Sequence, residues 1–541
     1  MRKLLRYPGE IQRAKLRAIL ERNADTVYGR QHGFSRIRNV RDYQKRVPIN
    51  TFEALRSSVE RMAHGEANVL TSTAPLMFAR TSGTSGAPKL IPVTPEFRDE
   101  YYSRIWFLTL LCRYPSSAAP KSILSVAGSA AEDRTEADIP IGSISGHLYQ
   151  RQRPGIRARY VLPYEVFSIR DLQARYYSLL RFALEASVRI IVTPNPSTLL
   201  LLTEKAKEHA EAIIEDIAAG RLRRDIPIES HVRATLEADL APNPNRAREL
   251  ARLAGRESFR PTRFWPRLQA ICCWLDGPAR LYLNEVTATY EGVPLHNMGY
   301  LASEGRGSLP FGWSGRTVTA VGSHFFEFIP EEAREEASPP ALTVEQLEVG
   351  RRYFIVFTTS GGLYRYDIDD VVAVTGQYLG TPVLEFIRKG SSVHSFTGEK
   401  VTEDQVTLAM EEAIREVEVA VAFFVLVPEW GRPPRYRLLV EHREPAQPDT
   451  DGRLAEVFDQ ALQRLNIEYR SKRSCERLAA VATARLRMGS YATYRRHRGE
   501  QGSADAQFKV SSLCPKEGPL VEFLKTRCLI ERGSDLEFAV A

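Results

Sequence analysis

Hydroxyl, glycine and lysine residues cluster in one stretch near the N-terminus, directly after a short apolar run. The stretch reads Thr-Ser-Gly-Thr-Ser-Gly-Ala-Pro-Lys over residues 81–89. Glycines allow turns whose backbone N–H groups converge on an anion, while hydroxyls and a lysine ammonium add further donors. Such a loop suits a polyphosphate, and ATP is the ligand that it favours.

The end of this loop separates it from the commoner phosphate-binding loop. That loop requires Gly, four residues and then Gly-Lys-Ser/Thr. Here Ala-Pro-Lys follows Gly86, and Leu90 rather than a hydroxyl residue follows Lys89. A kinase-type loop is therefore excluded. A polar surface turn would have a similar composition, but the density of this nine-residue match favours a phosphate site.

Two later stretches also carry polar side chains beside apolar strands. The first, residues 300–304, reads Tyr-Leu-Ala-Ser-Glu and follows a predicted strand at 294–298. The second, residues 364–370, reads Tyr-Arg-Tyr-Asp-Ile-Asp-Asp and follows a predicted strand at 353–358 and a Gly-Gly turn. We interpret both as loops at strand ends.

Composition places the chain among ordinary globular proteins. It has 541 residues, of which 43% are hydrophobic and 26% charged, so one large domain and a smaller one are expected. The net charge is +8, but the basic residues are scattered among almost as many acids. A nucleic-acid-binding protein should present a coherent basic face. We therefore expect no nucleic-acid partner.

Neither a membrane segment nor a cysteine-based site is predicted. The basic N-terminus runs directly into Tyr-Pro-Gly-Glu, and the longest apolar run, 419–427, is too short to span a bilayer. The six cysteines lack CxxC spacing, which argues against zinc and against a disulfide framework. We expect a cytoplasmic protein, a monomer, in which Cys272 and Cys273 pack as small apolar residues.

Helical and strand patterns alternate along the first two thirds of the chain, as in α/β folds. Beyond about residue 388, helices and strands form a compact α+β unit, so we assign an N-terminal domain to 1–388 and a C-terminal domain to 389–541. The acidic segment 331–348 is predicted to be an exposed connection. Helices are expected at 10–23, 51–63, 95–111, 171–186, 197–219, 402–415 and 452–468, and strands at 122–127, 189–193, 268–274, 294–298, 353–358, 419–427, 435–440 and 478–487.

The order and spacing of the three polar stretches resemble those of adenylate-forming enzymes. Finer features resemble one branch, the auxin-responsive-promoter family of acyl acid amido synthetases, over essentially the whole chain. They are Phe-Phe-Glu-Phe-Ile-Pro at 325–330, Gly-Leu-Tyr-Arg-Tyr at 362–366 and Gln-Phe-Lys at 507–509. The resemblance implies a large domain with mixed sheets and flanking helices, followed by a small mobile α+β domain.

The resemblance also implies roles for individual residues. Glu304 would ligate Mg²⁺, Ala302 and Ser303 would lie against the nucleotide, and Arg388 would reach its oxygens. Lys509 would swing onto the reacting phosphate during adenylation. The β- and γ-phosphates of ATP would be held by the first loop, through Ser82, Gly83, Thr84, Ser85, Gly86 and Lys89.

Asp370 matches the aspartate that binds both ribose hydroxyls, but its neighbours depart from the family pattern. Asp369 stands where glycine is usual, and Asp367 where a basic residue is common. Either acid could compete for the ribose or repel phosphate. Ala302 replaces a frequent serine, which removes about one hydrogen bond, worth roughly 0.5–1.5 kcal/mol.

The activity that the resemblance implies is a two-step ligation with ATP and Mg²⁺. A small carboxylic acid is adenylated, and an amino acid amine then takes the acyl group to form an amide. The backbone at Gly299, Tyr300 and Leu301 is expected to border a hydrophobic acyl pocket, whereas His296 is interpreted as structural. Two alternatives remain open: a ligase that uses coenzyme A or a carrier protein as acceptor, and a nucleotide-binding regulator without turnover.

Overall fold

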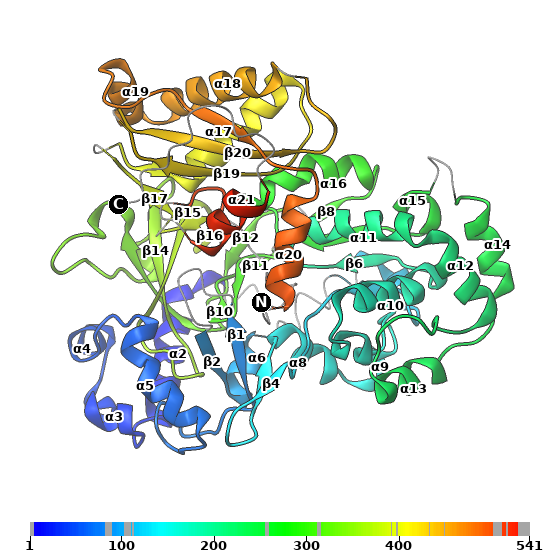
Figure 1. Cartoon of the computed structure of the whole chain (residues 1–541). Coiled ribbons are helices and arrows are strands. Elements are labelled where there is room, and N and C mark those ends of the chain that lie inside the picture. Colours follow the sequence, from blue (N-terminus) through cyan, green and yellow to red (C-terminus); the bar gives the residue numbers. More distant parts are fainter. Residues whose placement is uncertain are drawn as a thin grey trace. The chain divides into compact units, whose positions relative to one another are not determined.

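The computed structural model describes residues 5–81, 89–101, 110, 113–254, 259–310, 315–390, 392–396, 399–431, 433–447, 449–500, 511–514 and 518–528. The chain divides into two compact units, and the division falls between Phe386 and Ile387. Figure 1 follows the chain from the N-terminal helices in blue to the C-terminal elements in red.

A four-stranded parallel sheet lies in the first unit. Three of its four strands are short, mostly buried apolar runs, as expected for a sheet covered on both faces. Their order is β3 (Ile123–Ser125), β6 (Ile190–Val192), β7 (Ala270–Cys273) and β8 (Leu295–Asn297). Cys272 and Cys273 are free and buried in β7, as predicted.

Helices rich in leucine and alanine cover this sheet and share its core. They include α10 (Leu172–Glu185), whose first turn is capped by Asp171, α11 (Ser197–Glu208) and α16 (Leu283–Thr289). In Figure 1 α10 and α11 lie beside β6. The single helix predicted at 197–219 is wrong, because the helix breaks at His209 and resumes as α12 (Ala210–Ala219).

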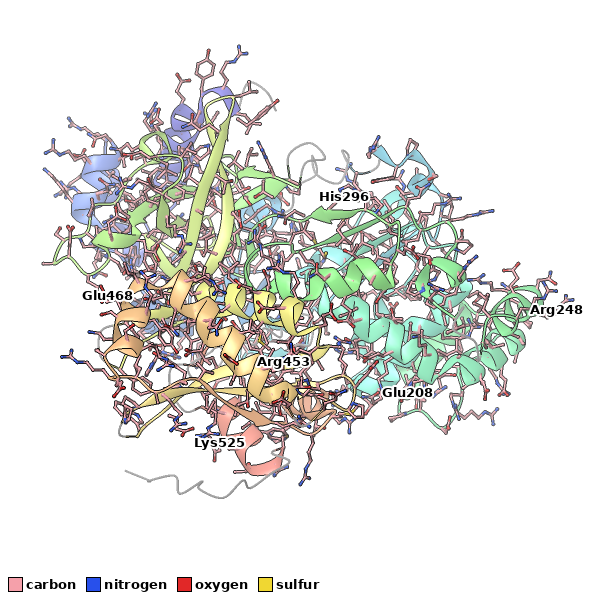
Figure 2. The ribbon with its side chains drawn as sticks, turned by 90° about the horizontal axis from the view of Figure 1, so that it is seen from above. Glu208, Arg248, His296, Arg453, Glu468 and Lys525 are labelled. Carbon is pink, nitrogen blue, oxygen red and sulfur yellow. The ribbon has the colours of Figure 1, made fainter. Side chains whose placement is uncertain are left out.

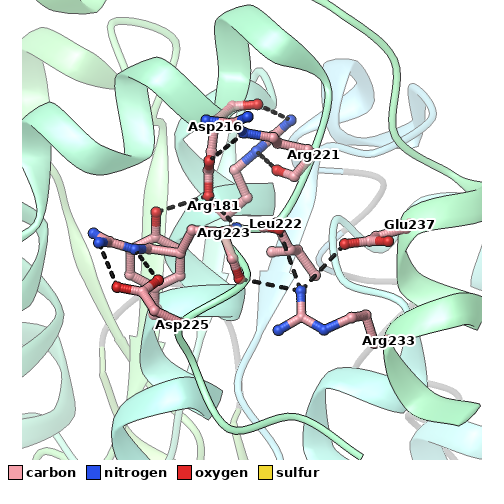
Figure 3. A network of polar contacts seen from close by, with 9 residues as sticks. Arg181, Asp216, Arg221, Leu222, Arg223, Asp225, Arg233 and Glu237 are labelled. Atoms are coloured by element: carbon pink, nitrogen blue, oxygen red, sulfur yellow. Dashed lines mark hydrogen bonds and ion pairs between the residues drawn. The ribbon is translucent and has the colours of Figure 1, made fainter. Parts of the chain in front are cut away.

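A buried polar network ties these helices together. Arg181 of α10 is fully buried and donates to the backbone oxygens of Asp216 and Arg221, each at 3.1 Å. The Asp216 carboxylate accepts from the Tyr177 hydroxyl at 2.8 Å and from the Arg223 N–H at 2.7 Å. Figure 3 shows how these contacts converge at the end of α12. Such a satisfied network makes this side of the unit rigid.

The second half of the first unit is built on a six-stranded sheet. Its order is β11 (Ser308–Pro310), β12 (Thr317–Thr319), β16 (Thr381–Lys389), β15 (Tyr366–Tyr378), β14 (Arg352–Thr358) and β13 (Phe325–Pro330). A smaller sheet has the order β2 (Lys89–Val93), β1 (Met77–Thr81), β5 (Pro140–Gly142) and β4 (Asp133–Arg134).

The N-terminal helices are fastened to the six-stranded sheet by two buried amides. Gln12 of α2 (Pro8–Arg22) donates to the backbone oxygens of Val321 and His324 at 2.7 and 2.6 Å. The Asn50 side-chain amide donates to the Tyr364 backbone oxygen at 2.7 Å. The Asn50 backbone N–H donates to Arg365 O and its backbone oxygen accepts from Asp367 N–H, both at 2.8 Å. These contacts join residues more than 300 positions apart in the sequence.

Two predictions about the polypeptide near this sheet are wrong. The third polar stretch is not wholly a loop, because from Tyr366 onward it belongs to β15. The segment 331–348 is not simply an exposed connection either. Val344 and Leu347 are buried in the core, since apolar residues between acids were enough to anchor the segment.

The second unit combines a three-stranded sheet with helices, as the α+β prediction stated. The sheet has the order β19 (Val421–Glu429), β20 (Arg435–His442) and β21 (Ala482–Arg485). The helix predicted at 452–468 ends early, because Asn466 caps a new helix through its bond to Tyr469 N–H. The helices are α17 (Glu403–Val417), α18 (Thr450–Leu465), α19 (Ile467–Ser474), α20 (Ser490–Glu500) and α21 (Pro519–Arg527), and a ribbon joins β17 (Val393–His394) to β18 (Val401–Thr402).

Acidic and basic side chains are both exposed on the helices of the first unit. Glu208 and Arg248, both exposed on helices of the first unit, illustrate this (Figure 2). Among the described helices, none combines the length and the apolar character needed to cross a membrane. The remaining helices are α3 (Val27–Gln31), α4 (Val40–Arg46), α5 (Phe52–Ala63), α6 (Pro95–Tyr101), α8 (Ile144–Gln150), α9 (Pro154–Arg157), α13 (Ser230–Ala238), α14 (Pro244–Ala251) and α15 (Pro261–Phe264).

Candidate active site

The second polar stretch forms a tight hairpin just beyond the carboxyl end of β8. Strand β9 (Leu301–Ala302) pairs antiparallel with β10 (Gly305–Arg306), so Ser303 and Glu304 occupy the two-residue turn. Glu304 is 8% exposed. The carboxyl edge of a parallel sheet is where α/β proteins bind ligands, so the turn lies in a suitable place for one.

Gly299 sets the direction in which the chain enters this hairpin. Its φ is +80°, and a Cβ added there would lie 2.7 Å from the Ser308 backbone oxygen. Its N–H donates to the Asn297 side chain at 3.0 Å. The Tyr300 N–H donates to the Ser308 hydroxyl at 2.8 Å. Side-chain oxygens from the neighbouring strands therefore hold both residues.

Tyr300 connects the second polar stretch to the third. Its ring stacks on Phe386 with centroids 5.5 Å apart, and its hydroxyl donates to the Asp370 carboxylate. Both Tyr300 and Asp370 are buried, Asp370 being only 3% exposed. Burial, the Asp370 charge and the nearby Glu304 charge together raise the pKa of Tyr300 well above its ordinary value. The structure therefore places both Asp370 and Glu304 near Tyr300.

Asp367 and Asp369 are held together by a cation that the sequence did not predict. Arg334 forms an ion pair with Asp367, and its Nη2 lies 3.8 Å from Asp369 Oδ1. Asp367 also accepts the Asp369 N–H at 2.8 Å. Burial raises the pKa of Asp367, and Arg334 opposes this shift. Asp367 therefore points to Arg334, while Asp370 points to Tyr300.

The structure describes only the two ends of the predicted phosphate loop, Thr81 and Lys89, since residues 82–88 lie outside the described part. Lys89 is the end that carries the predicted ammonium group. It opens β2 and pairs in register with Thr81 at the end of β1. Its Nζ lies 5.6 Å from the centre of the Phe52 ring. Arg56 and, more weakly, Lys89 lower the pKa of Glu53. The Glu53 charge in turn contributes to raising the pKa of Tyr366.

Arg388 lies in the second unit and is buried in local contacts. Its Nε is 3.2 Å from Asp404 Oδ1, and its Nη1 donates to the backbone oxygen of Lys389 at 2.9 Å. The structure therefore shows Arg388 as an ion-paired residue, and its contact with a nucleotide stays a prediction. Lys509 lies outside the described residues.

Two buried residues stabilise the hairpin, and neither was predicted from the sequence: His324, which contacts the hairpin, and Arg306, which belongs to β10. The ring Nε2 of His324 accepts the Arg306 N–H at 3.1 Å. Arg306 donates from Nε to the Tyr101 backbone oxygen at 2.8 Å. Burial lowers the pKa of His324 to about 3 and that of Arg306 to about 10. A buried histidine beside a glycine-rich turn gives no periodic signal, so only the fold reveals it.

His296, labelled in Figure 2, lies on β8 four residues before Tyr300. Its Nε2 and the Tyr114 hydroxyl share a hydrogen bond of 2.7 Å. Burial, followed by the charge of Arg113, lowers the pKa of His296. The imidazole is therefore neutral near pH 7 and tied to Tyr114, in keeping with the structural interpretation.

Comparison with known proteins decides the family. The N-terminal, central and C-terminal domains described for the GH3 family match residues 1–295, 317–389 and 404–517, in that order. The chain belongs to the GH3 family. The resemblance read from the motifs is thereby confirmed over most of the chain.

Relatives within the GH3 family cover almost the full length. A jasmonoyl–L-amino acid synthetase of Oryza sativa subsp. japonica is 27% identical over 94% of this chain and 92% of its own length. An indole-3-acetic acid-amido synthetase of Arabidopsis thaliana is 23% identical over 96% of this chain and 91% of its own length.

The fold of this GH3 chain matches that of a solved structure. The GH3.15 acyl acid amido synthetase superposes with a TM-score of 0.83 at 22% identity, covering 98% of this chain and 95% of that one. The predicted fold class, a mixed α/β unit followed by a smaller α+β unit, is confirmed.

Proposed function

We propose that this GH3 protein is an ATP-dependent acyl acid amido synthetase. In the first step a carboxylate oxygen attacks the α-phosphorus of ATP, the bond to the bridging oxygen breaks and pyrophosphate leaves. In the second step a neutral amino acid amine attacks the acyl carbon of the acyl-adenylate. The bond to AMP breaks, the amine loses a proton, and an amide is released together with AMP.

The hydrogen bond between Tyr300 and Asp370 is the observation that carries this proposal. It joins the two polar stretches across 70 residues of sequence through a buried tyrosine, on which the charges of both Asp370 and Glu304 act. A carboxylate offers two acceptor oxygens and so suits the pair of ribose hydroxyls. Ala302 and Ser303, at the adjoining hairpin, would lie against the nucleotide.

Phosphate recognition would come from the first loop. Its hydroxyls and N–H groups, from Ser82, Gly83, Thr84, Ser85 and Gly86, would surround the β- and γ-phosphates together with the Lys89 ammonium. Arg388 would reach nucleotide oxygens. Lys509, on a small domain that rotates between the two steps, would neutralise charge only during adenylation.

Glu304 suits Mg²⁺, which takes one or two carboxylates and completes its shell with phosphate oxygens and water. Among the described residues, no group of three or more His, Cys, Asp or Glu side chains forms a ready metal site. Phosphate oxygens would therefore supply the other ligands. When bound, Mg²⁺ would stabilise the charge on the leaving pyrophosphate.

The substrates of the relatives give the classes to test. The relatives named above act, by their names, on indole-3-acetic acid and on jasmonate-type acids. An apolar pocket bordered by the backbone of Gly299, Tyr300 and Leu301 would accept a hydrophobic or aromatic acid. We further propose that the protein acts as a monomer in the cytoplasm.

Acid-dependent exchange of pyrophosphate into ATP tests the first step over a panel of carboxylic acids. An acid that supports exchange is then supplied with amino acids or with coenzyme A, and the product is identified by mass spectrometry. Amide formation supports the proposal. A thioester product would assign the protein to the coenzyme A ligases, and tight ATP binding without exchange would make it a regulator; either result would overturn it.

A further inference from the structure

The strand that carries Asp370 contains an irregular segment, which we call the aspartate bulge (residues 367–370). Phe354 pairs with Val371 and Val356 with Asp367, so Ile355 alone faces three residues of β15. A bulge bends a strand and re-aims its side chains. Here the side chains of Asp370 and Asp367 point in different directions, the first to Tyr300 and the second to Arg334.

Asp369 adopts an uncommon backbone conformation within this bulge. Its φ is +62°, in the left-handed region that favours glycine and that aspartate only tolerates. The bulge also brings three carboxylates into four residues, and like charges this close repel each other. Both features work against the observed geometry unless another group stabilises it.

Arg334 is placed to stabilise the aspartate bulge. It forms the ion pair with Asp367 and approaches Asp369, and its guanidinium lies across the Phe354 ring, 4.5 Å from the ring centre. Phe354 borders the point at which the strand register shifts. Arg334 therefore contacts two acids of the bulge and the strand beside it.

We propose that Arg334 is a positioning residue for nucleotide recognition: by binding Asp367 and Asp369 it fixes the bulge so that Asp370 alone faces the ribose hydroxyls. The inference rests on the proposed function, because it takes the ribose as the ligand of Asp370. It also explains how this chain replaces a glycine with Asp369 and keeps its neighbouring acids away from the nucleotide.

Equilibrium binding of AMP, 2′-deoxy-AMP and 3′-deoxy-AMP to the full chain tests this without an acyl substrate. The wild type should prefer AMP. Arg334→Ala should weaken AMP binding roughly tenfold, the loss expected when a hydrogen bond to a charged group is misplaced, and leave the deoxynucleotides nearly unchanged. The preference for the intact ribose would therefore shrink.

A second substitution distinguishes positioning from general stability. Adding Asp369→Gly to Arg334→Ala should recover most of the AMP affinity, because glycine adopts φ near +60° without support and one repelling charge is gone. Arg351→Ala is the matched control. Arg351 is an exposed arginine paired with Glu332 and Glu348, so its loss should leave the preference for AMP unchanged.

The variant Asp370→Asn distinguishes a failure of the inference about Arg334 from a failure of the ribose assignment on which it rests. If this variant loses the ribose preference while Arg334→Ala keeps the wild-type preference, even with a lowered melting temperature, the role of Arg334 is overturned and the proposed function stands. If Asp370→Asn keeps the full preference, the ribose assignment itself fails and the inference fails with it.

Discussion

The guanidinium of Arg365 pairs with the carboxylate of Glu327 at 2.9 Å, and both side chains are buried. Glu327 lies on β13 and also accepts from the Gln44 side chain at 2.9 Å, while Arg365 donates to the Val47 backbone oxygen at 2.9 Å. Both charged residues belong to segments on which the family resemblance was recognised. Their partners indicate that they stabilise the six-stranded sheet and the segment around residues 44–47 that packs on it.

Breaking this pair should destabilise the protein strongly. Glu327→Ala or Arg365→Ala should each lower the free energy of unfolding by roughly 3–5 kcal/mol, because the remaining charge stays buried without its partner. Urea denaturation measures the effect. The double variant should lose less free energy of unfolding than the two single variants lose in sum, because it leaves no unpaired charge. Arg351→Ala, which breaks exposed pairs, should cost less than about 1 kcal/mol; similar losses for buried and exposed pairs would contradict the assignment.

Removing the Lys89 ammonium should impair the first step. Lys89→Ala is expected to reduce acid-dependent ATP–pyrophosphate exchange roughly a hundredfold or more, the typical effect of removing one preorganised donor to developing charge. Lys205→Ala is a suitable control, since Lys205 pairs with Glu208 on α11. Full exchange activity in Lys89→Ala would refute the phosphate role of the loop.

A methyl group at Gly307 should disturb Tyr300. A Cβ at this position would lie 2.1 Å from Tyr300 Cδ1, so the ring would have to leave its stack on Phe386 and its bond to Asp370. Gly307→Ala should weaken AMP binding roughly tenfold, as measured by calorimetry. Gly322→Ala has no atom within 4 Å of the added group. Equal AMP affinity in the two variants would argue against the role of Tyr300.

Asp276 makes the stability of the first unit depend on pH in a defined direction. Burial raises its pKa from 3.8 to about 6, although the Asn297 amide donates to it at 3.0 Å. The folded state therefore binds more protons between about pH 4 and 6, and this group's contribution to stability falls as pH rises through that window.

Asp276→Asn keeps an acceptor for Asn297 but removes the buried charge. It should raise the free energy of unfolding at pH 7, by at most about 3 kcal/mol for a shift of this size, and make little difference near pH 4. Urea denaturation between pH 4 and 7.5 measures both. A constant difference between variant and wild type across this range would show that Asp276 does not titrate as described.

The sequence predicts the strands of the parallel sheet and the long amphipathic helices such as α2, α10 and α17, because their apolar runs and periodicity are local properties. It does not predict short helices such as α3 and α14, or strands such as β15 and β16 of the six-stranded sheet. It cannot locate breaks that depend on a single cap. His209 ends one helix and Asn466 begins another, where the amphipathic pattern continues without interruption. The family fold could therefore be predicted, and the exact ends of its elements could not.

The candidate site likewise has features that the sequence predicts and others that only the folded structure reveals. The motifs predict that Glu304 and Asp370 lie beside a nucleotide, which stays a prediction, and the hairpin and the bulge give these residues their geometry. Arg334 could not be identified, because it lies in an acidic segment whose composition indicates a surface connection. Only the folded chain brings it within reach of Asp367. Long-range ion pairs of this kind leave no periodic signal in a single sequence.

The amide contacts of Gln12 and Asn50 have a consequence for synthesis of the chain. Gln12 bonds to residues near 321–326, and Asn50 to residues 364–367. A ribosome releases these partners some 300 residues after the helices that need them, so contacts of very high sequence separation must close late. The N-terminal helices therefore cannot dock on the sheet until most of the first unit has been translated. Until then their apolar faces stay exposed to solvent. Chaperone binding to nascent chains shorter than about residue 370 is the expected result.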